Sequence, residues 1–315
     1  PGFSAFGLTR GGGADPLALH EGAALLGQSA NCAALEMVGL GGTFEATTDL
    51  RIALTGAELK AQIDGAQVPW NACHALPKGT TLTIGGTKSG VFGYLHVGGG
   101  FDTPRYMGTR GAHLSAGLGQ LVQAGDSLPV GDDPGGATGV FLPRDNRFDG
   151  GNLRVVHSMQ THEFSAEMRA AFTATPFKRD PRANRQGVRM DCEGDGFRAE
   201  NQLGIVSEVI VPGDIQIPGD GRPFVLMSES QTTGGYPRMG TVLAVDLPRI
   251  AQAPTGAEMQ FDFVTLEDAR QIEARERTRR ATLRKQVQPL LREPAQMADL
   301  LSHQLISGAT AGYDT

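Results

Sequence analysis

Short apolar runs rich in β-branched residues recur along most of this chain and are separated by glycine and proline. Runs of this length, bounded by turn residues, predict strands rather than helices. In the first half such runs lie at 34–38, 50–54, 59–63, 80–84 and 92–97. Between two of them, Asp64-Gly65 predicts a tight hairpin, because both residues tolerate a positive φ. We therefore expect an antiparallel β-barrel or a curled sheet.

The second half repeats this pattern, with apolar runs at 153–157, 203–208, 223–227 and 241–245. Phe164, Met168 and Phe172 recur at helical spacing, which predicts one helix with its apolar stripe in the core. The stretch 132–151 is rich in glycine, aspartate and proline and is expected to link the two halves. Two halves of similar size, each with strands and one helix, suggest two related barrels.

Helix boundaries are marked at both ends of the chain. Asp15 followed by Pro16 is a strong N-terminal signal, and Gly27 is expected to end that helix. Thr265 and Asp268 have the spacing of a capping box and predict a highly charged helix over 268–288. A second short helix is expected to carry one apolar side that needs a partner surface, formed by Met297, Leu300, Leu301 and Leu305.

We therefore predict a fold that is mainly β. Its domains are expected at 1–140, 141–265 and, as a helical extension with a tail, 266–315.

Composition narrows the classes of function. The formal net charge of -6 disfavours a surface that binds nucleic acid. Three scattered cysteines are too few for a disulfide framework or a cysteine-based zinc site, and no histidine pair has metal-ligand spacing. No apolar run approaches the roughly 18 residues of a membrane span, and no signal segment is visible from Pro1 onwards. We expect a cytoplasmic protein without a bound metal.

The polar stretch 228–238 is the strongest candidate site, because it lies between two apolar runs that are expected to be core strands. Glycines allow the backbone to approach a ligand, while amide, hydroxyl and phenol groups can hold an amide or a carboxyl group. A tight hairpin whose side chains bond their own backbone is the alternative. The candidate residues are Glu229, Gln231, Thr232, Thr233, Gly234, Gly235, Tyr236 and Arg238.

Further candidates lie outside this stretch. Arg10 lies in a glycine-rich loop that precedes Asp15 and could present amides and a guanidinium to an anion. Glu36 lies within an apolar run, so it is either paired or faces a cavity. Arg110 follows a run of three glycines and could contact a carboxylate or phosphate. Arg185 and Arg189 belong to a basic cluster that is either a solvated face or an anion-binding wall.

Several motifs occur here in the order typical of one family. They are Gly12-Gly13-Ala14-Asp15-Pro16, Ala34-Leu35-Glu36, Ala53-Leu54-Thr55-Gly56-Ala57, the stretch 94–108, Ser207-Glu208, the stretch 212–218 and Gln231-Thr232-Thr233-Gly234-Gly235-Tyr236-Pro237. The chain resembles the allophanate hydrolase subunit 2 family, also called the biotin-dependent carboxyltransferase or Kip-type family. That family includes the C-type subunit of bacterial 5-oxoprolinase. The resemblance extends over nearly all of the chain up to about residue 263.

The resemblance implies two cyclophilin-like β-barrel domains with a site in the groove between them, acting as part of a heteromeric complex. In 5-oxoprolinase, B-like and A-like subunits work with such a chain to couple ATP hydrolysis to the opening of 5-oxo-L-proline to glutamate. One alternative is a carboxyltransferase that moves CO2 from carboxybiotin to urea or a similar amide, the biotin being supplied by another protein. Another is a regulatory partner of a kinase inhibitor, without chemistry of its own.

For the amide hydrolase we assign hypothetical roles. Gln231, Thr232 and Thr233 would hold the substrate amide, and Tyr236 would donate to the developing oxyanion. Arg238 would pair with a carboxylate or phosphoryl group, Glu208 or Glu229 would act as base, and Arg10 and Arg110 would form the opposite wall. Family members often have Asp-Arg before Gln-Thr-Thr and Lys after Tyr-Pro, whereas this chain has Glu229-Ser230 and Arg238. These differences bear on the identity of the substrate.

Overall fold

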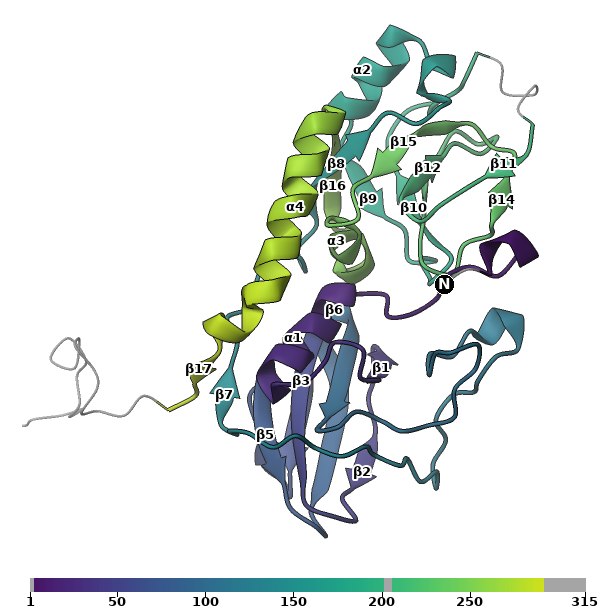
Figure 1. Ribbon diagram of the computed structural model, residues 1–315. Coiled ribbons are helices and arrows are strands. Elements are labelled where there is room, and N and C mark those ends of the chain that lie inside the picture. The colour runs from purple at the N-terminus through teal and green to yellow at the C-terminus, as the bar shows by residue number, and fades with distance from the viewer. Residues whose placement is uncertain (1–2, 201–205, 292–315) are drawn as a thin grey trace, which may run out of the picture.

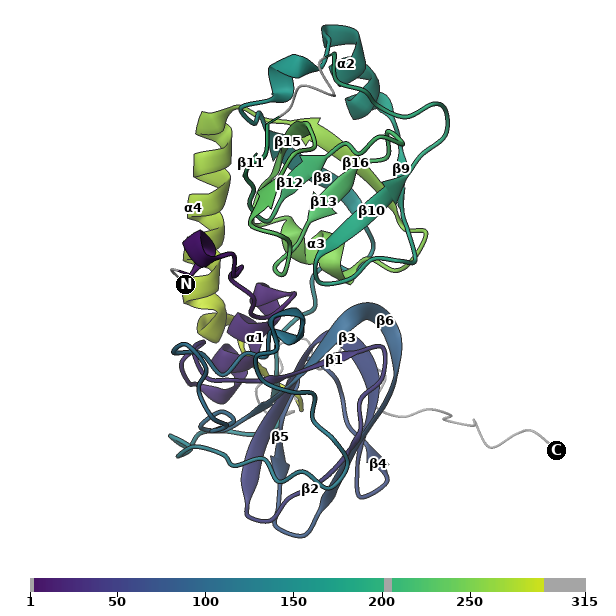
Figure 2. The same ribbon diagram turned by 90° about the vertical axis from the view of Figure 1, so that its right-hand side faces the viewer.

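The computed structural model describes residues 3–200 and 206–291, which form two stacked β-structures with one long helix beside them (Figure 1). The N-terminal sheet lies below the C-terminal barrel in that view. Figure 2 shows the same stacking from the side, with α4 running along both parts. The prediction of a mainly β fold is confirmed. None of the helices in the described part of the chain combines the length and apolar character that a membrane span requires.

The first half forms an eight-stranded sheet whose main path runs β1-β6-β3-β5-β7-β17, with β2 on β6 and β4 on β3. Of the two expected alternatives it is the curled sheet, since this path does not close. The predicted hairpin at Asp64-Gly65 is confirmed between β3 and β4. The strands are β1 Leu35–Val38, β2 Thr43–Glu45, β3 Leu50–Ile63, β4 Ala66–Gln67, β5 Ala72–Leu76, β6 Thr81–Val97, β7 Val140–Phe141 and β17 Gln288–Pro289.

Two pairs of predicted strands are each one continuous strand. The runs 50–54 and 59–63 merge in β3, and the runs 80–84 and 92–97 merge in β6. The glycines between them do not end the strands, because the β3–β6 pairing shifts register near Gly56 and continues. Gly56 has φ +73°, and a Cβ there would lie 2.5 Å from the carbonyl oxygen of Phe92. A bend with close backbone contact therefore replaces the expected turn.

The second half forms a closed seven-stranded barrel in the order β10-β13-β12-β15-β8-β16-β9. Its core contains stacked aromatic rings, with the Phe172 and Phe261 centroids 4.9 Å apart. A separate two-stranded ribbon, β11 with β14, lies beside the barrel (Figure 1). The strands are β8 Gly151–Val156, β9 Phe177–Arg179, β10 Gly187–Asp191, β11 Glu208–Val209, β12 Asp214–Gln216, β13 Phe224–Leu226, β14 Thr233–Gly234, β15 Arg238–Val242 and β16 Glu258–Phe263.

The helices follow the predicted boundary signals. Asp15 caps α1 by accepting hydrogen bonds from the amides of Leu17 and Ala18, and Gly27 ends the helix in the left-handed conformation. Thr265 caps α4 by accepting from the Asp268 amide. The predicted apolar helix at 297–305 lies outside the described residues. The helices are η1 Ser4–Phe6, α1 Pro16–Leu26, η2 Leu114–Ala116, η3 Thr161–Glu163, α2 Ala166–Ala174, α3 Leu247–Gln252, α4 Leu266–Thr282 and η4 Leu283–Gln286.

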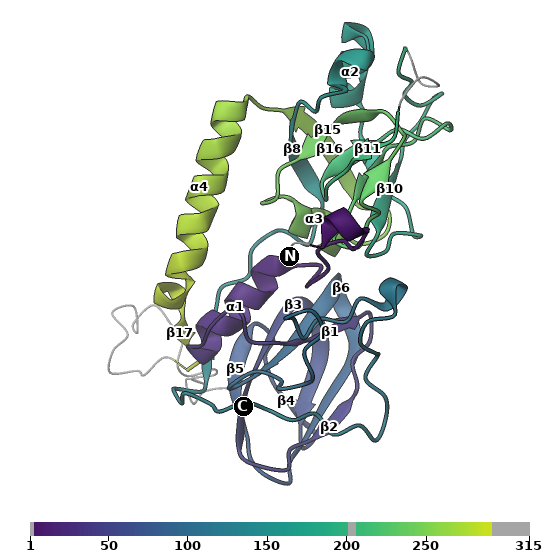
Figure 3. The same ribbon diagram turned by 45° about the vertical axis from the view of Figure 1, so that its right-hand side comes forward.

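The stretch predicted as a linker and the segment predicted as a C-terminal helical extension both join the two halves. The stretch 132–151 is not a plain linker, because it contributes β7 to the first sheet and buries Arg147. The predicted helix over 268–288 ends at Thr282, and the chain continues through η4 into β17. There Gln288 pairs with Phe141 of β7. Figure 3 shows α4 descending from the barrel to the first sheet beside α1.

The contact between the halves combines an apolar core with buried charges. Phe92 and Tyr94 of β6 belong to the same hydrophobic cluster as the barrel interior. Gln252 of α3 accepts hydrogen bonds from the Val91 and Phe92 amides and donates to Asp15 at 2.9 Å. Asp15 also pairs with Arg147, which holds Glu21 through Nη2 at 2.6 Å. The residues that cap α1 therefore also fix the barrel on the sheet.

Glu21 provides a test of this interface through pH. Burial raises the pKa of Glu21 to about 7, although Arg147 favours its charged form. Since the folded-state pKa is above the ordinary value of 4.5, the stability that Glu21 contributes is fully present below about pH 4.5. It is lost as the pH rises to about 7. We expect wild-type stability relative to Glu21→Gln to fall by about 3 kcal/mol across this range.

Urea unfolding of both proteins at several pH values would measure this difference. Parallel stability curves for the wild type and Glu21→Gln would contradict the prediction. Asp145→Asn is a suitable second control. The Asp145 carboxylate also pairs with Arg147, but its side chain is 34% exposed.

Candidate functional site

The polar stretch 228–238 crosses from one side of β12 to the other. β13 and β15 flank it in sequence but not in the barrel, where β12 lies between them. The alternative of a tight hairpin is therefore wrong. Instead the middle of the stretch forms β14 and pairs with β11, so that Thr233 lies opposite Val209 and Gly234 opposite Glu208. The stretch is held at both ends by barrel strands and presents its middle to solvent.

The polar side chains at the middle of this stretch are not engaged in hydrogen bonds within the described part of the chain. Gln231, Thr233 and Tyr236 are exposed, Tyr236 to 51%. Within residues 3–200 and 206–291, none of these side chains nor that of Thr232 makes a hydrogen bond. Gly235 is also exposed, and Gly234 packs so closely that a Cβ there would lie 2.4 Å from Gln216 Nε2. Unengaged donors on a glycine-containing strand can bind an incoming amide or carboxyl group.

Arg238 and Glu208 form an ion pair beneath the ribbon. The Arg238 guanidinium is buried, lies 3.3 Å from Asp214 Oδ2 and donates to the Val209 carbonyl oxygen at 3.0 Å. Gln160 accepts from both its backbone amide and its Nε. Arg238 therefore fastens the ribbon to the barrel, and a substrate carboxylate would have to compete with Glu208. The predicted roles of Arg238 and Glu208 in binding and catalysis stay predictions.

A second cluster joins the two halves and contains three of the predicted residues. Arg185 bonds Glu36 and the Gly12 carbonyl oxygen, and its Nε lies 2.6 Å from Glu229 Oε1. Glu36 also accepts from the Tyr94 hydroxyl at 2.6 Å. Of the two interpretations of Glu36, the paired one describes this structure. Burial and the Glu36 carboxylate raise the pKa of Tyr94 well above its ordinary value, so its hydroxyl stays a donor.

Backbone contacts place the N-terminal segment against the candidate stretch. The Gly11 amide donates to the Ser228 carbonyl oxygen at 3.1 Å. The Glu229 amide donates to the Arg185 carbonyl oxygen at 2.9 Å. The Thr9 hydroxyl lies 3.0 Å from His113 Nε2, which brings in the loop before η2. A groove between the halves, as the resemblance implies, would therefore have these segments as its walls.

The remaining predicted residues have different surroundings. Arg10 is exposed, and its side chain has no partner among the described residues. Arg110 pairs with Asp102, and Asp15 is fully buried in the interface. Arg189 pairs with Asp220 and with Asp191 at 3.3 Å. Arg10 alone of these is free to meet an anion.

Sequence reasoning included Ser228 and Ser230 in the stretch and Gln216 in the motif at 212–218, but it assigned no role to their side chains. Ser230 is 3% exposed and Gln216 6%, and Ser230 Oγ and Gln216 Nε2 have no hydrogen-bond partner in the described part of the chain. Ser228 Oγ is in the same situation. Buried polar atoms without partners are uncommon in native proteins, and a catalytic or binding role is one explanation for them. Their positions in the sequence, within or beside apolar runs, carry a weak signal that could have marked them.

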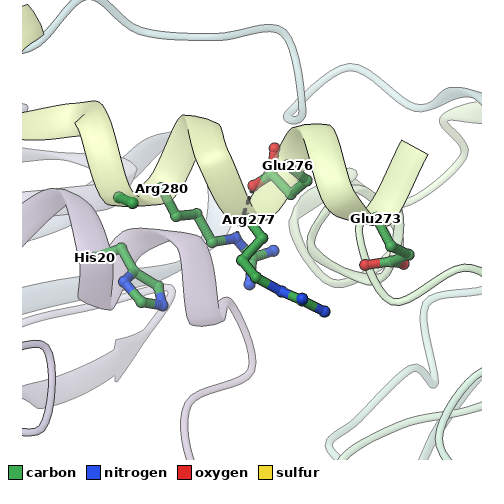
Figure 4. A pocket seen from close by; sticks show the side chains of 6 residues that line it. His20, Glu273, Glu276, Arg277 and Arg280 are labelled. Carbon is green, nitrogen blue, oxygen red and sulfur yellow. Dashed lines mark hydrogen bonds and ion pairs between the residues drawn. The ribbon is translucent and has the colours of Figure 1, made fainter. Parts of the chain in front are cut away.

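Two hollows lie elsewhere on the molecule. One, of about 370 Å³, lies between α1 and α4 and is lined by His20, Glu273, Glu276, Arg277, Arg280 and Ala281. Figure 4 shows Arg280 reaching toward Glu276, with His20 facing them from α1. Burial and Arg280 lower the pKa of His20. Two carboxylates, Glu273 and Glu276, lie in the lining beside Arg277 and Arg280, and Glu276 pairs with Arg280, so this hollow has no excess of positive charge to bind an anion.

Neither this hollow nor one of about 480 Å³ beside Arg154 and Arg249 contains a predicted site residue. The described residues hold no group of three or more histidine, cysteine, aspartate or glutamate side chains placed to bind a metal ion.

Comparison with known proteins supports the resemblance. Residues 6–263 match the family described as carboxyltransferase domain, subdomain A and B. The chain is 34% identical to the C-type subunit of 5-oxoprolinase from Escherichia coli over 276 residues, which are 85% of this chain and 87% of that protein. The TTHA0988 crystal structure is similar with a TM-score of 0.73 and 29% identity, over 82% of this chain and 51% of that one.

This chain therefore spans about half the length of that solved protein. The urea amidolyase of K. lactis shares the fold, with a TM-score of 0.78 at 20% identity over 93% of this chain and 20% of that one. The match over most of the chain and the relative at 34% identity together show that this protein belongs to the carboxyltransferase domain family, subdomain A and B.

Proposed function

We propose that this chain is the C-type subunit of an ATP-dependent hydrolase that opens a cyclic amide, with 5-oxo-L-proline as the expected substrate and glutamate as the product. The observation that carries the proposal is the 34% identity to the C-type subunit of a 5-oxoprolinase over 87% of that protein's length. The free donors of Gln231, Thr233 and Tyr236 support it, since an amide substrate needs such groups.

The exposed side chains suggest a division of roles. The Tyr236 hydroxyl and the Gln231 amide can donate hydrogen bonds to the lactam carbonyl oxygen as negative charge develops on it. Glu208 has a side chain that is 45% exposed, whereas the Glu229 side chain is 9% exposed and held by Arg185. Glu208 is therefore the better placed of the two to accept a proton from an attacking water. Glu229 is better placed to orient Arg185 and Glu36.

ATP would supply the free energy that makes opening of a stable lactam favourable. A polyphosphate needs donors that no carboxylate already holds. Arg10 meets this condition within the described residues, and Gly11 and Gly12 beside it have φ of +60° and +88°. The Gly11 amide is held by the Ser228 carbonyl oxygen, so the contact would rest on the Arg10 guanidinium, and we infer that this segment is where the chain would contact the nucleotide.

A carboxyltransferase is the second candidate. The family description and the shared fold with urea amidolyase favour it. An amide substrate would then accept CO2 at the same donors, and carboxybiotin would be presented by another protein. The site chemistry is compatible with both reactions, because each places negative charge on an amide oxygen.

Phosphate release from ATP tests the proposal. The chain would be mixed with its B-like and A-like partners, with and without 5-oxo-L-proline, and glutamate would be measured in parallel. We expect phosphate and glutamate to appear together, and only when this chain and the lactam are both present. Phosphate release that does not depend on the lactam would contradict the proposal. So would a complex with the partners that forms but produces neither phosphate nor glutamate. CO2 transfer from carboxybiotin to urea would establish the second candidate.

A further inference from the structure

Arg179, the last residue of β9, is a buried arginine without a counter-charge. It is 6% exposed, and its Nε has no hydrogen-bond partner in the part of the chain that the structure describes. Within residues 3–200 and 206–291 its guanidinium also makes no ion pair. The adjacent Asp180 carboxylate holds Arg182 instead, with Oδ1 at 2.9 Å from Arg182 Nε and Oδ2 at 2.5 Å from its Nη2.

Arg179 differs in this respect from Arg147 and Arg238, the other buried arginines among the described residues, which each contact at least two carboxylates. A buried charge without such a partner is costly. Burial lowers the pKa of Arg179, and the Asp180 carboxylate opposes this only in part. Because a guanidinium nevertheless stays charged in proteins, an anion from outside the described residues would stabilise it.

Arg179 turns into the barrel at the end that faces the first half. Side chains alternate along β9, where Phe177 is fully buried and Lys178 is exposed. Arg179 therefore shares the inner side with Phe177 and with Met190, its cross-strand neighbour on β10. β16 begins beside this end of β9, a few residues after α3. α3 lies at the same end of the barrel, next to β6 (Figure 3).

The candidate stretch leaves the barrel at this end as well. β10 runs antiparallel to both β9 and β13, so it begins where they end, with Gly187 opposite Leu226. The stretch starts two residues after Leu226, and the Oγ atoms of Ser228 and Ser230 are buried without a partner in the described part of the chain. A guanidinium and two hydroxyls that lack partners therefore belong to the same end of the barrel.

We propose that Arg179 binds the carboxylate of a lactam substrate at this end of the barrel, with the hydroxyls of Ser228 and Ser230 as further donors. This inference rests on the proposed function, because 5-oxo-L-proline carries a carboxylate beside its ring amide. A guanidinium can bind a carboxylate through two parallel N–H groups. Since the chain continues from Ser230 to Gln231, the carboxylate contact would lie beside an expected donor to the ring amide.

Binding of 5-oxo-L-proline without ATP tests this inference apart from turnover. The full chain, assembled with its B-like and A-like partners, would be equilibrated with the labelled lactam. We expect Arg179→Met to weaken binding by about tenfold or more, because charge-assisted hydrogen bonds are lost. Arg179→Lys keeps the charge and should weaken binding less. Arg182→Met is the matched control, since the Arg182 side chain is 73% exposed and also lies beside Asp180. It should bind as the wild type does.

Two further measurements identify the bound group and the cause of a loss. The wild type should bind 2-pyrrolidone, the same ring without a carboxylate, about tenfold more weakly or worse, and inorganic phosphate should not displace 5-oxo-L-proline. This comparison of ligands needs no variant. The urea midpoint of Arg179→Met should equal or exceed that of the wild type, because the substitution removes an uncompensated buried charge.

Unchanged binding by Arg179→Met, or equal weakening by Arg179→Met and Arg182→Met, would overturn the inference. So would a wild type that does not bind 5-oxo-L-proline, or one that binds phosphate through Arg179 in place of the carboxylate. A lower urea midpoint for Arg179→Met would mean that the guanidinium has a stabilising partner in the protein, which also contradicts the inference. Binding that depends on Arg179 but leads to no turnover would contradict the proposed function and leave the carboxylate site established.

Discussion

Arg147→Met is expected to lower the free energy of unfolding by about 3 to 5 kcal/mol. Arg147 is 4% exposed and lies 2.8 Å from Asp15 and 2.6 Å from Glu21, both of which are buried. Methionine fills much of the same volume but leaves the Asp15 carboxylate, and above about pH 7 also that of Glu21, without this counter-charge. Because these carboxylates lie between the sheet and the barrel, the loss should appear as a lower midpoint in urea unfolding.

Arg144→Met is the matched control for this prediction. Arg144 and Arg147 both stack on Phe148, at 4.0 Å and 4.6 Å from the ring centroid. Arg144 differs in that its side chain is 31% exposed and its partner Glu58 is 32% exposed. Its replacement should cost at most about 1 kcal/mol, as is usual for surface ion pairs. If both variants lose a similar free energy of unfolding, Arg147 does not stabilise the buried carboxylates as predicted.

Tyr236→Phe is expected to reduce turnover of the assembled complex by about a hundredfold, if the phenol donates to the oxyanion. The Tyr236 side chain is half exposed and makes no hydrogen bond within the described part of the chain. Loss of the hydroxyl should therefore change stability by less than about 0.5 kcal/mol. The measurement is kcat for lactam-dependent phosphate release, together with an unfolding curve for the variant.

Tyr106→Phe provides the comparison for the second prediction, since Tyr106 is 43% exposed and lies in another loop. This variant should keep the wild-type rate. An unchanged kcat for Tyr236→Phe would remove the phenol from the proposed mechanism. A weaker partner affinity with unchanged kcat would assign Tyr236 to docking instead.

Local signals in the sequence predicted local structure well. Asp15, Pro16 and Gly27 set both ends of α1, because capping and left-handed glycine act within one turn of helix. The Asp64-Gly65 hairpin follows from the same kind of short-range preference. The continuous strand β6 was missed because Gly85-Gly86 resembles a turn in the sequence. In the structure the β3–β6 pairing shifts register there, between Leu59 with Thr87 and Ala61 with Ile84, and continues past both glycines.

The candidate site was predictable in its composition but not in its pairings. The polar stretch at 228–238 stands out between apolar runs, and in its middle the side chains of Gln231, Thr233 and Tyr236 are exposed. The pairings of Glu36 with Arg185 and of Arg238 with Glu208 join distant segments, so they depend on the tertiary fold. Arg147 was overlooked because its segment has the composition of a linker. Its burial arises only when both halves meet around it.

The return of the chain through α4 to β17 has a consequence for biosynthesis. β7 and β17 form the edge of the first sheet, and β17 lies at 288–289, after the whole barrel. Domains generally fold in the order in which they emerge from the ribosome. Here the N-terminal sheet cannot complete that edge until the barrel has been synthesised. A fragment ending at residue 140 would lack that last strand, so we expect the two halves to mature together on one nascent chain.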